Sequence, residues 1–147
     1  MTHNPSKILE RGCTILETVL AMHGFKLLDI TTGKGSGGSY AVATLASGKR
    51  KLELHYRHSL GLVTYHFGEM ALSHEEYMYA LLGPKGGNKY PCFSDEPFEA
   101  FRGIAHDLEK FAIAFLTGDE IEFGRCTKLA RRHASLSGFE RLAESEG

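Results

Sequence analysis

The sequence is poor in cysteine, and this scarcity excludes two kinds of small protein. Cys13, Cys92 and Cys126 are odd in number and far apart, and none belongs to a C-x-x-C pair. A disulfide framework typically has an even number of cysteines, and a zinc site made of thiolates has closely spaced pairs. The pattern therefore favours the reducing environment of the cytosol.

Strong charge and long apolar runs are also missing. The formal net charge is −1 at pH 7, which gives no general attraction to nucleic acid or to an anionic membrane surface. No apolar run approaches the roughly 20 residues that a membrane-spanning helix needs. The first residues, MTHNPSKILERGC, lack the basic and then apolar pattern of a secretory signal. We expect a soluble, cytoplasmic protein that binds neither nucleic acid nor membrane.

What the sequence does contain predicts one α+β domain over residues 1–137 and a mobile or loosely docked tail at 138–147. A chain of 147 residues suits a single domain. Asn4 followed by Pro5 is a typical helix start, because asparagine caps free N–H groups and the fixed φ of proline is already helical. This helix is expected to end at Gly24, since glycine readily adopts the left-handed conformation that closes a helix.

Four strands are expected after this helix. Apolar and polar residues alternate along them, which predicts one buried face. The connections are only a few residues long, and such short links force neighbouring strands to run antiparallel. The result is a four-stranded antiparallel meander with strands at 25–32, 39–46, 51–58 and 62–68.

About three more helices are expected after the sheet, packed on one of its faces. Ser73 and Glu76 form a capping box, which marks the start of a short helix. A long apolar stripe predicts a second helix at 96–116. Asp119 gives a weaker start signal for a last helix at 120–136.

The register of the last hairpin follows from its polarity pattern, because a shift of one residue would turn every side chain to the other face. An even-numbered loop centred on Leu60 and Gly61 keeps the apolar residues on one face and places His55 directly opposite His66. A three-residue loop that ends in a left-handed Gly61 is the alternative, and it mixes polar with apolar residues on both faces. We therefore expect the even-numbered loop. The preceding hairpin, with its turn at residues 48–49, selects the same inner face.

The polar face of this sheet is the main candidate site. If the helices cover the apolar face, the polar face is left partly open, and its tyrosine, arginine and histidine content is typical of a protein-contact surface. We expect a protein partner or a second copy of the chain to bind there, without a cofactor. The expected contact residues are Tyr40, Val42, His55, Arg57, Thr64 and His66.

The same face contains the best candidates for a metal site. His55 and His66 as cross-strand neighbours would be close enough to bind one metal ion, and Glu53 could add a third ligand. A Zn²⁺ ion with one open position could then activate water. Arg57 would add unfavourable positive charge, however, and polar residues are ordinary on the solvent side of a sheet. An interaction surface is therefore favoured, with a metal-dependent or ligand-binding enzyme at Glu53, His55 and His66 as the alternative.

Two glycine-rich stretches are weaker candidates. GKGSGG at 33–38 matches G-x-G-x-x-G, but that motif binds a pyrophosphate only where a helix follows, and here a strand is expected. We predict a flexible hairpin loop instead. GPKGGNK at 83–89 lacks the G-K-[ST] ending of a phosphate loop. Residues 83–95 are a candidate moving segment that could gate a small-molecule pocket between the sheet and the helices.

Two further groups of side chains have simple explanations. Cys92 could act as a nucleophile with His106 and Asp107, but adjacent helical residues point about 100° apart and cannot easily face it together. A packed, inert cysteine is favoured. The basic stripe on the last helix is favoured as a solvated surface, because no aromatic platform for nucleic acid accompanies Arg125, Lys128 and Arg132.

Two segments carry a resemblance to known proteins: HSLGLVTYHFGEMALSHEEYMYALLG and YPCFSDEPFEAFRGIAHDLEKFAIAFLTGD. Over residues 58–119 the chain resembles small bacterial proteins of uncharacterised function. Its general layout is also similar to immunity-type proteins that pair with secreted toxins. The resemblance implies a partner-binding protein instead of an enzyme, and it transfers no catalytic residue.

Overall fold

The computed structural model describes residues 4–35, 38–92 and 94–135, which form an α+β fold around one antiparallel sheet. The tail expected at 138–147 lies outside the described residues. The elements follow in the order α1 (Pro5–Leu20), η1 (Ala21–His23), β1 (Lys26–Gly35), β2 (Gly38–Ser47), β3 (Arg50–Tyr56), β4 (Leu60–Phe67), β5 (Met70–Ser73), α2 (His74–Leu82), η2 (Gly83–Lys85), α3 (Pro97–Lys110), α4 (Ile113–Thr117) and α5 (Glu120–Ser135).

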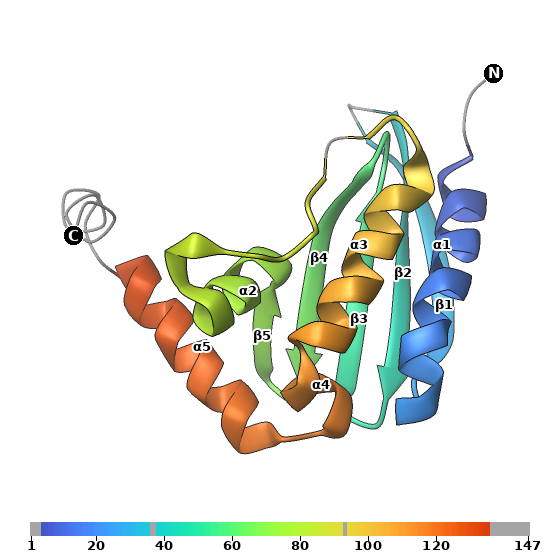
Figure 1. The fold of residues 1–147 in the computed structure, drawn as a ribbon. Helices are drawn as coiled ribbons and strands as arrows, with labels where there is room; N and C mark the ends of the chain where they lie inside the picture. The colour runs from blue at the N-terminus through green and yellow to red at the C-terminus, as the bar shows by residue number, and fades with distance from the viewer. Residues whose placement is uncertain (1–3, 36–37, 93, 136–147) are drawn as a thin grey trace.

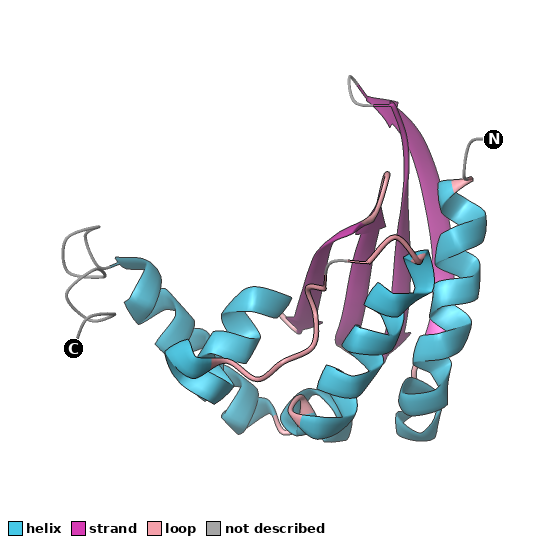
Figure 2. Ribbon diagram, turned by 45° about the horizontal axis from the view of Figure 1, so that its top comes forward, coloured by secondary structure: helices cyan, strands magenta, loops and turns pink. Residues whose placement is uncertain are grey.

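The α-helices lie on one side of the sheet or beyond its β5 edge. Figure 1 shows α1 and α3 in front of the strands, with α4 at the lower end of α3 and with α2 and α5 next to β5. Figure 2 shows the sheet behind this helical layer, with no described helix on its other side. We call the covered side of the sheet the inner face and the opposite side the outer face. The outer face is therefore the part of the sheet that remains available for contacts.

The N-terminal helix begins and ends as predicted. The side chain of Asn4 accepts a hydrogen bond from the N–H of Ser6 at 3.1 Å, and Pro5 is the first helical residue. After η1, Gly24 adopts the left-handed conformation with a φ of 83°. The buried stripe of the helix, made of Leu9, Cys13, Leu16 and Leu20, is at most 1% exposed.

The sheet is a meander, as predicted, but it has five strands in the order β1-β2-β3-β4-β5. The additional strand β5 pairs antiparallel with β4, and Thr64 lies opposite Ser73. The prediction of four strands missed β5 because it contains only four residues, MALS, immediately before a capping box. So few residues give almost no alternation from which a strand can be recognised.

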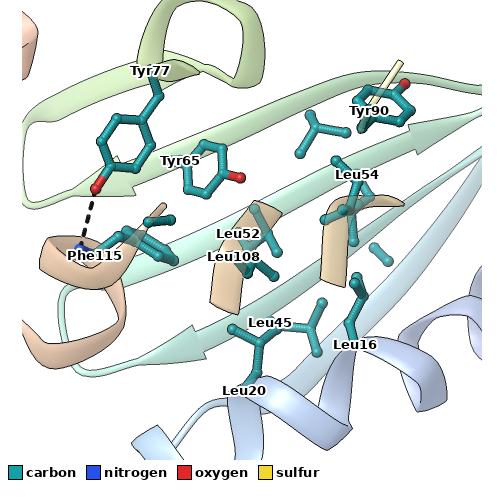
Figure 3. Close-up of a cluster of buried hydrophobic side chains, with 14 of the residues drawn as sticks. Leu16, Leu20, Leu45, Leu52, Leu54, Tyr65, Tyr77, Tyr90, Leu108 and Phe115 are labelled. Atoms are coloured by element: carbon teal, nitrogen blue, oxygen red, sulfur yellow. Dashed lines mark hydrogen bonds between the residues drawn. The ribbon is translucent and has the colours of Figure 1, made fainter. Parts of the chain in front are cut away.

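The inner face is the apolar face that the alternation predicted. Figure 3 shows leucines from α1, β2, β3 and α3 meeting in one cluster beside the rings of Tyr65, Tyr77 and Phe115. The burial of apolar side chains in such a cluster is the main favourable contribution to folding. The predicted inner residues are all at most 3% exposed: Ala41, Ala43, Leu45, Leu52, Leu54, Tyr56, Val63, Tyr65 and Phe67.

The register predicted between β3 and β4 is wrong, although the assignment of faces is right. His66 lies opposite Lys51 instead of His55, and Tyr56 pairs with Leu60, so the loop covers residues 57–59. The alternative loop is wrong as well, because Gly61 has no positive φ. A slide of an even number of residues leaves every side chain on its own face, so polarity cannot detect it.

The helix predicted at 96–116 is interrupted between α3 and α4. Ala112 leaves the helical conformation, with a ψ of 41°. The break lets the N–H of Phe115 donate to the hydroxyl oxygen of Tyr77 at 3.3 Å (Figure 3). It also exposes the carbonyl of Phe115 to the guanidinium of Arg50, which donates to it at 2.8 Å. Ala112 and Phe115 are both buried, so the apolar stripe continues through the break. The sequence pattern therefore does not show that the helix is interrupted.

The hairpin of β1 and β2 is longer than predicted. β1 continues to Gly35 and β2 starts at Gly38, so most of GKGSGG belongs to strands and not to a loop. Residues 36–37 lie outside the described part of the chain. The predicted pairs of the next hairpin, in contrast, are all present: Ala41 with Tyr56, Ala43 with Leu54 and Leu45 with Leu52.

Candidate functional site

Strand pairing arranges the outer face in rows that run across the strands. One row is basic, because Lys26, Lys51 and His66 occupy it on β1, β3 and β4. The next row is acidic, with Asp29 on β1 and Glu53 on β3. The third row contains uncharged and histidine side chains: Thr31, Val42 and His55.

The predicted contact residues all belong to this face or to its end. Val42, His55, Thr64 and His66 are half-buried although no described helix covers them. Tyr40 lies one row beyond Val42, near the loop that follows β3. Arg57 belongs to that loop, and its guanidinium lies over the ring of Tyr40 at 5.6 Å from the centroid.

Glu53 joins the two predicted histidines into what we call the outer cluster, made of Glu53, His55 and His66. One carboxylate oxygen is 3.0 Å from Nε2 of His55, and the other is 2.9 Å from Nε2 of His66. The two rings are therefore linked through the carboxylate and not by direct opposition. Partial burial would raise the pKa of Glu53, but the hydrogen bonds to both histidines outweigh it and lower the pKa.

A metal site is not formed by the outer cluster. Within the described ranges, no group of three or more histidine, cysteine, aspartate or glutamate side chains is arranged to hold a metal ion. Nε2 of each histidine is directed at an oxygen of Glu53. The arrangement is a hydrogen-bonded surface cluster in which Glu53 orients both rings.

Two adjoining clefts lie at the end of the sheet, around the pair of Tyr40 and Arg57. The larger one, about 1160 Å³, extends from the start of α1 to the β1–β2 hairpin and includes Lys34 in its wall. The smaller one, about 520 Å³, opens toward the outer face. Tyr40, Arg57 and His58 line both clefts, so these three side chains form the wall between them.

A second histidine cluster lies in the core, and no sequence pattern predicts it. Tyr65 donates its hydroxyl hydrogen to Nδ1 of His74 at 2.7 Å, and Nε2 of His74 donates to the carboxylate of Asp107 at 2.9 Å. We call these three side chains the buried cluster. Its members come from β4, the first residue of α2 and α3, so the cluster connects three elements.

Asp107 also holds the chain segment that precedes α3. Its carboxylate accepts the N–H groups of Lys89 at 2.7 Å and Tyr90 at 2.9 Å, and it contacts Nδ1 of His106 at 2.9 Å. Burial would raise the pKa of Asp107, but these bonds and the one from His74 lower it. Tyr90 in turn donates its hydroxyl to the carbonyl of Leu60 at 2.7 Å. The segment predicted to move is therefore anchored at residues 89–90.

The buried cluster resembles a proton relay in composition, but it is sealed. Tyr65 and Asp107 are 0% exposed and His74 is 3% exposed, so no substrate atom can reach them. A catalytic base must lie within hydrogen-bond reach of its substrate. The cluster is therefore a structural connection. His74 is the first residue of α2, directly after the Ser73 cap, so the sequence pattern explains it as part of the helix start and not as a member of a cluster.

The other candidates behave as ordinary surface or packing residues. Asp107 turns inward to His74, so it does not form a triad with the half-buried Cys92. On α5, Arg125 pairs with Glu122 at 2.5 Å, as expected for a solvated basic face. All three cysteines are free thiols.

The comparisons with known proteins identify no relative. No protein-family model matches the chain, and no curated protein or solved structure is significantly similar to it. Across the described part of the chain, no helix combines the length and the apolar character needed to cross a membrane.

Proposed function

We propose that the protein is a non-enzymatic, cytoplasmic interaction domain whose outer face binds a second copy of the chain. The observation that carries the proposal is the order of the charged rows on a face that no described helix covers. Half-buried valine, threonine and histidine side chains lie in and beside these rows, so the charged groups are set in a partly buried surface.

The charged rows are complementary to themselves. In a face-to-face pair, a two-fold axis that runs between the basic and the acidic row places Lys51 of one subunit opposite Glu53 of the other. The same axis places Lys26 opposite Asp29. Two twisted sheets packed in this way form a sandwich with strands about 30° apart. The rows therefore favour one arrangement of two copies over a random one.

The size of the outer face is enough for a weak dimer. Five strands at a spacing of about 4.8 Å, with a mean length of about 8 residues at about 3.3 Å per residue, span roughly 24 by 26 Å. Two such faces bury about 1,200 Å² in total, which is the lower limit of stable interfaces. We therefore expect an association that depends on protein concentration and on salt.

Charge exchange across the two-fold axis tests the proposal. Wild-type protein should sediment with the mass of a dimer at high concentration. Lys51→Glu alone or Glu53→Lys alone places like charges opposite each other and should give monomers. A mixture of the two variants should give heterodimers, and the chain with both substitutions should dimerise again, because each restores opposite charges across the axis.

Lys110→Glu, on the helical side, is the matched control and should leave the dimer unchanged. A wild-type chain that stays monomeric at every concentration would overturn self-association. The face would then be available to a different protein. Dimers that persist in both single-charge variants would show that another surface forms the contact.

A further inference from the structure

The larger cleft at the end of the sheet has an unusual charge. Lys34, Arg57 and His58 line it, and no acidic side chain does so among the residues described. Neither Lys34 nor Arg57 forms an ion pair with a carboxylate in the described part of the chain. In a chain with a net charge of −1, this is a local concentration of positive charge. Its chemistry suits an anion.

The strands hold the arginine in position. The ring of Tyr40 lies directly on Gly33, where an added Cβ would be only 2.4 Å from the tyrosine hydroxyl oxygen. The guanidinium of Arg57 lies over this ring, and its Nη2 would be 3.1 Å from a Cβ added at Gly35. The glycines of the GKGSGG stretch thus let an aromatic ring and a guanidinium lie against β1. A guanidinium that already lies on a ring loses less freedom when it binds a ligand than a fully solvated one does.

The start of α1 also lines this cleft. Asn4 and Ser6 line the cleft there, with the N–H and the hydroxyl of Ser6 both donating to Oδ1 of Asn4. The positive end of this 16-residue helix adds to the local potential. Figure 1 shows the N-terminal end of α1 at the same end of the molecule as the tips of β1 and β2. Groups from three separate segments therefore face one space.

We propose that this cleft binds a small phosphate ester. Arg57 is suited to two parallel hydrogen bonds with phosphate oxygens, and Lys34 supplies a second full charge. The volume of about 1160 Å³ is much larger than a phosphate group, so it leaves room for an organic body next to the ring of Tyr40. The charged rows of the proposed dimer lie further along the strands than this cleft.

Isothermal titration calorimetry at low salt tests the proposal with four probes: inorganic phosphate, ribose 5-phosphate, AMP and adenosine. We expect AMP and ribose 5-phosphate to bind, inorganic phosphate to bind more weakly, and adenosine not to bind. Arg57→Gln and Lys34→Gln should each weaken AMP binding by about tenfold or more, because each removes a charged partner of the phosphate. Gly33→Ala, which displaces Tyr40, should weaken AMP more than inorganic phosphate.

Arg131→Gln and Lys110→Gln, on exposed positions of α5 and α3, are the matched controls and should bind AMP as the wild type does. Absence of heat for every phosphate probe up to about 10 mM would overturn the proposal, since that limit lies above the millimolar Kd of a weak specific ligand. Equal weakening in the controls would overturn it as well, because binding would then follow overall charge. Adenosine binding as tightly as AMP would also overturn the proposal, because the cleft would then recognise the aromatic base and not the phosphate.

Discussion

The two histidine clusters of this protein use the same chemical groups in opposite environments. In the outer cluster, Glu53 bridges His55 and His66 on a face where their side chains are 32–40% exposed. In the buried cluster, Asp107 and His74 are at most 3% exposed. The hydrogen-bond distances are almost equal, between 2.9 and 3.0 Å. Distance alone therefore does not distinguish a surface contact from a structural one.

Burial makes the difference, because it determines what replaces a lost partner. Water can take the place of Glu53 on the outer face, so the histidines would stay solvated. Water has no access to Asp107, and each of its donors would be left without a partner. We therefore expect the buried cluster to stabilise the fold and the outer cluster to contribute mainly to contacts.

The largest effect is expected for Asp107→Ala. This change leaves the N–H groups of Lys89 and Tyr90 and Nε2 of His74 without their acceptor. Removal of one partner from a buried charged network costs about 3–5 kcal/mol. Urea unfolding of both proteins measures the difference, with Glu53→Ala as the matched control. A loss below about 1 kcal/mol would contradict the structural role of the buried cluster.

Low pH should remove the stabilising effect of the Asp107 carboxylate. Because hydrogen bonds lower the pKa of Asp107 in the folded protein, its stabilising effect is complete above the ordinary value of 3.8 and is lost as the pH falls further. Asp107→Asn should therefore be less stable than wild type at neutral pH, and the gap should narrow below about pH 4. Urea unfolding at a series of pH values measures this gap. A gap that stays constant down to pH 2 would contradict the prediction.

Most of the fold follows from local signals, while β5 was missed because its four residues are too few to show a pattern. Caps at Asn4 and Ser73, and the alternation along β2 and β3, predict their elements correctly because each acts within a few residues. The register of β4, the break at Ala112 and the buried cluster depend on contacts between distant residues. The pattern of polar and apolar residues is the same whether a strand is shifted by an even number of residues or a helix is interrupted. The sequence pattern therefore predicts neither.

The candidate site was predictable only in its composition. Alternation places His55 and His66 on the outer face, and the structure agrees. Their connection through Glu53 depends on register, which the pattern did not give. His74 and Asp107 are 33 residues apart in the chain, and neither belongs to a motif. A buried polar pair of this kind becomes visible only when the position of His74 relative to α3 is known.

A smaller effect is expected for Tyr65→Phe. The substitution keeps the ring, which packs edge-on against Tyr77 at 5.0 Å, but it removes the hydrogen that Nδ1 of His74 accepts. An unsatisfied buried acceptor costs about 1–2 kcal/mol. Tyr56→Phe is the matched control, because Tyr56 is also buried but its hydroxyl has no hydrogen-bond partner among the described residues. Equal losses in urea unfolding would assign the effect to the ring environment and not to the hydrogen bond.

The smallest effect on stability is expected for Glu53→Gln, although this residue contacts two histidines. Exposed ion pairs contribute about 0–1 kcal/mol, so the free energy of unfolding should change by less than about 0.5 kcal/mol. The substitution removes the charge that the proposed dimer places opposite Lys51, so dissociation should become easier while each subunit stays folded. Unfolding at two protein concentrations separates the two effects, because only a dimer becomes more stable when it is concentrated. A loss as large as that of Asp107→Asn at low concentration would show that exposure does not distinguish the clusters, and the comparison between them would fail.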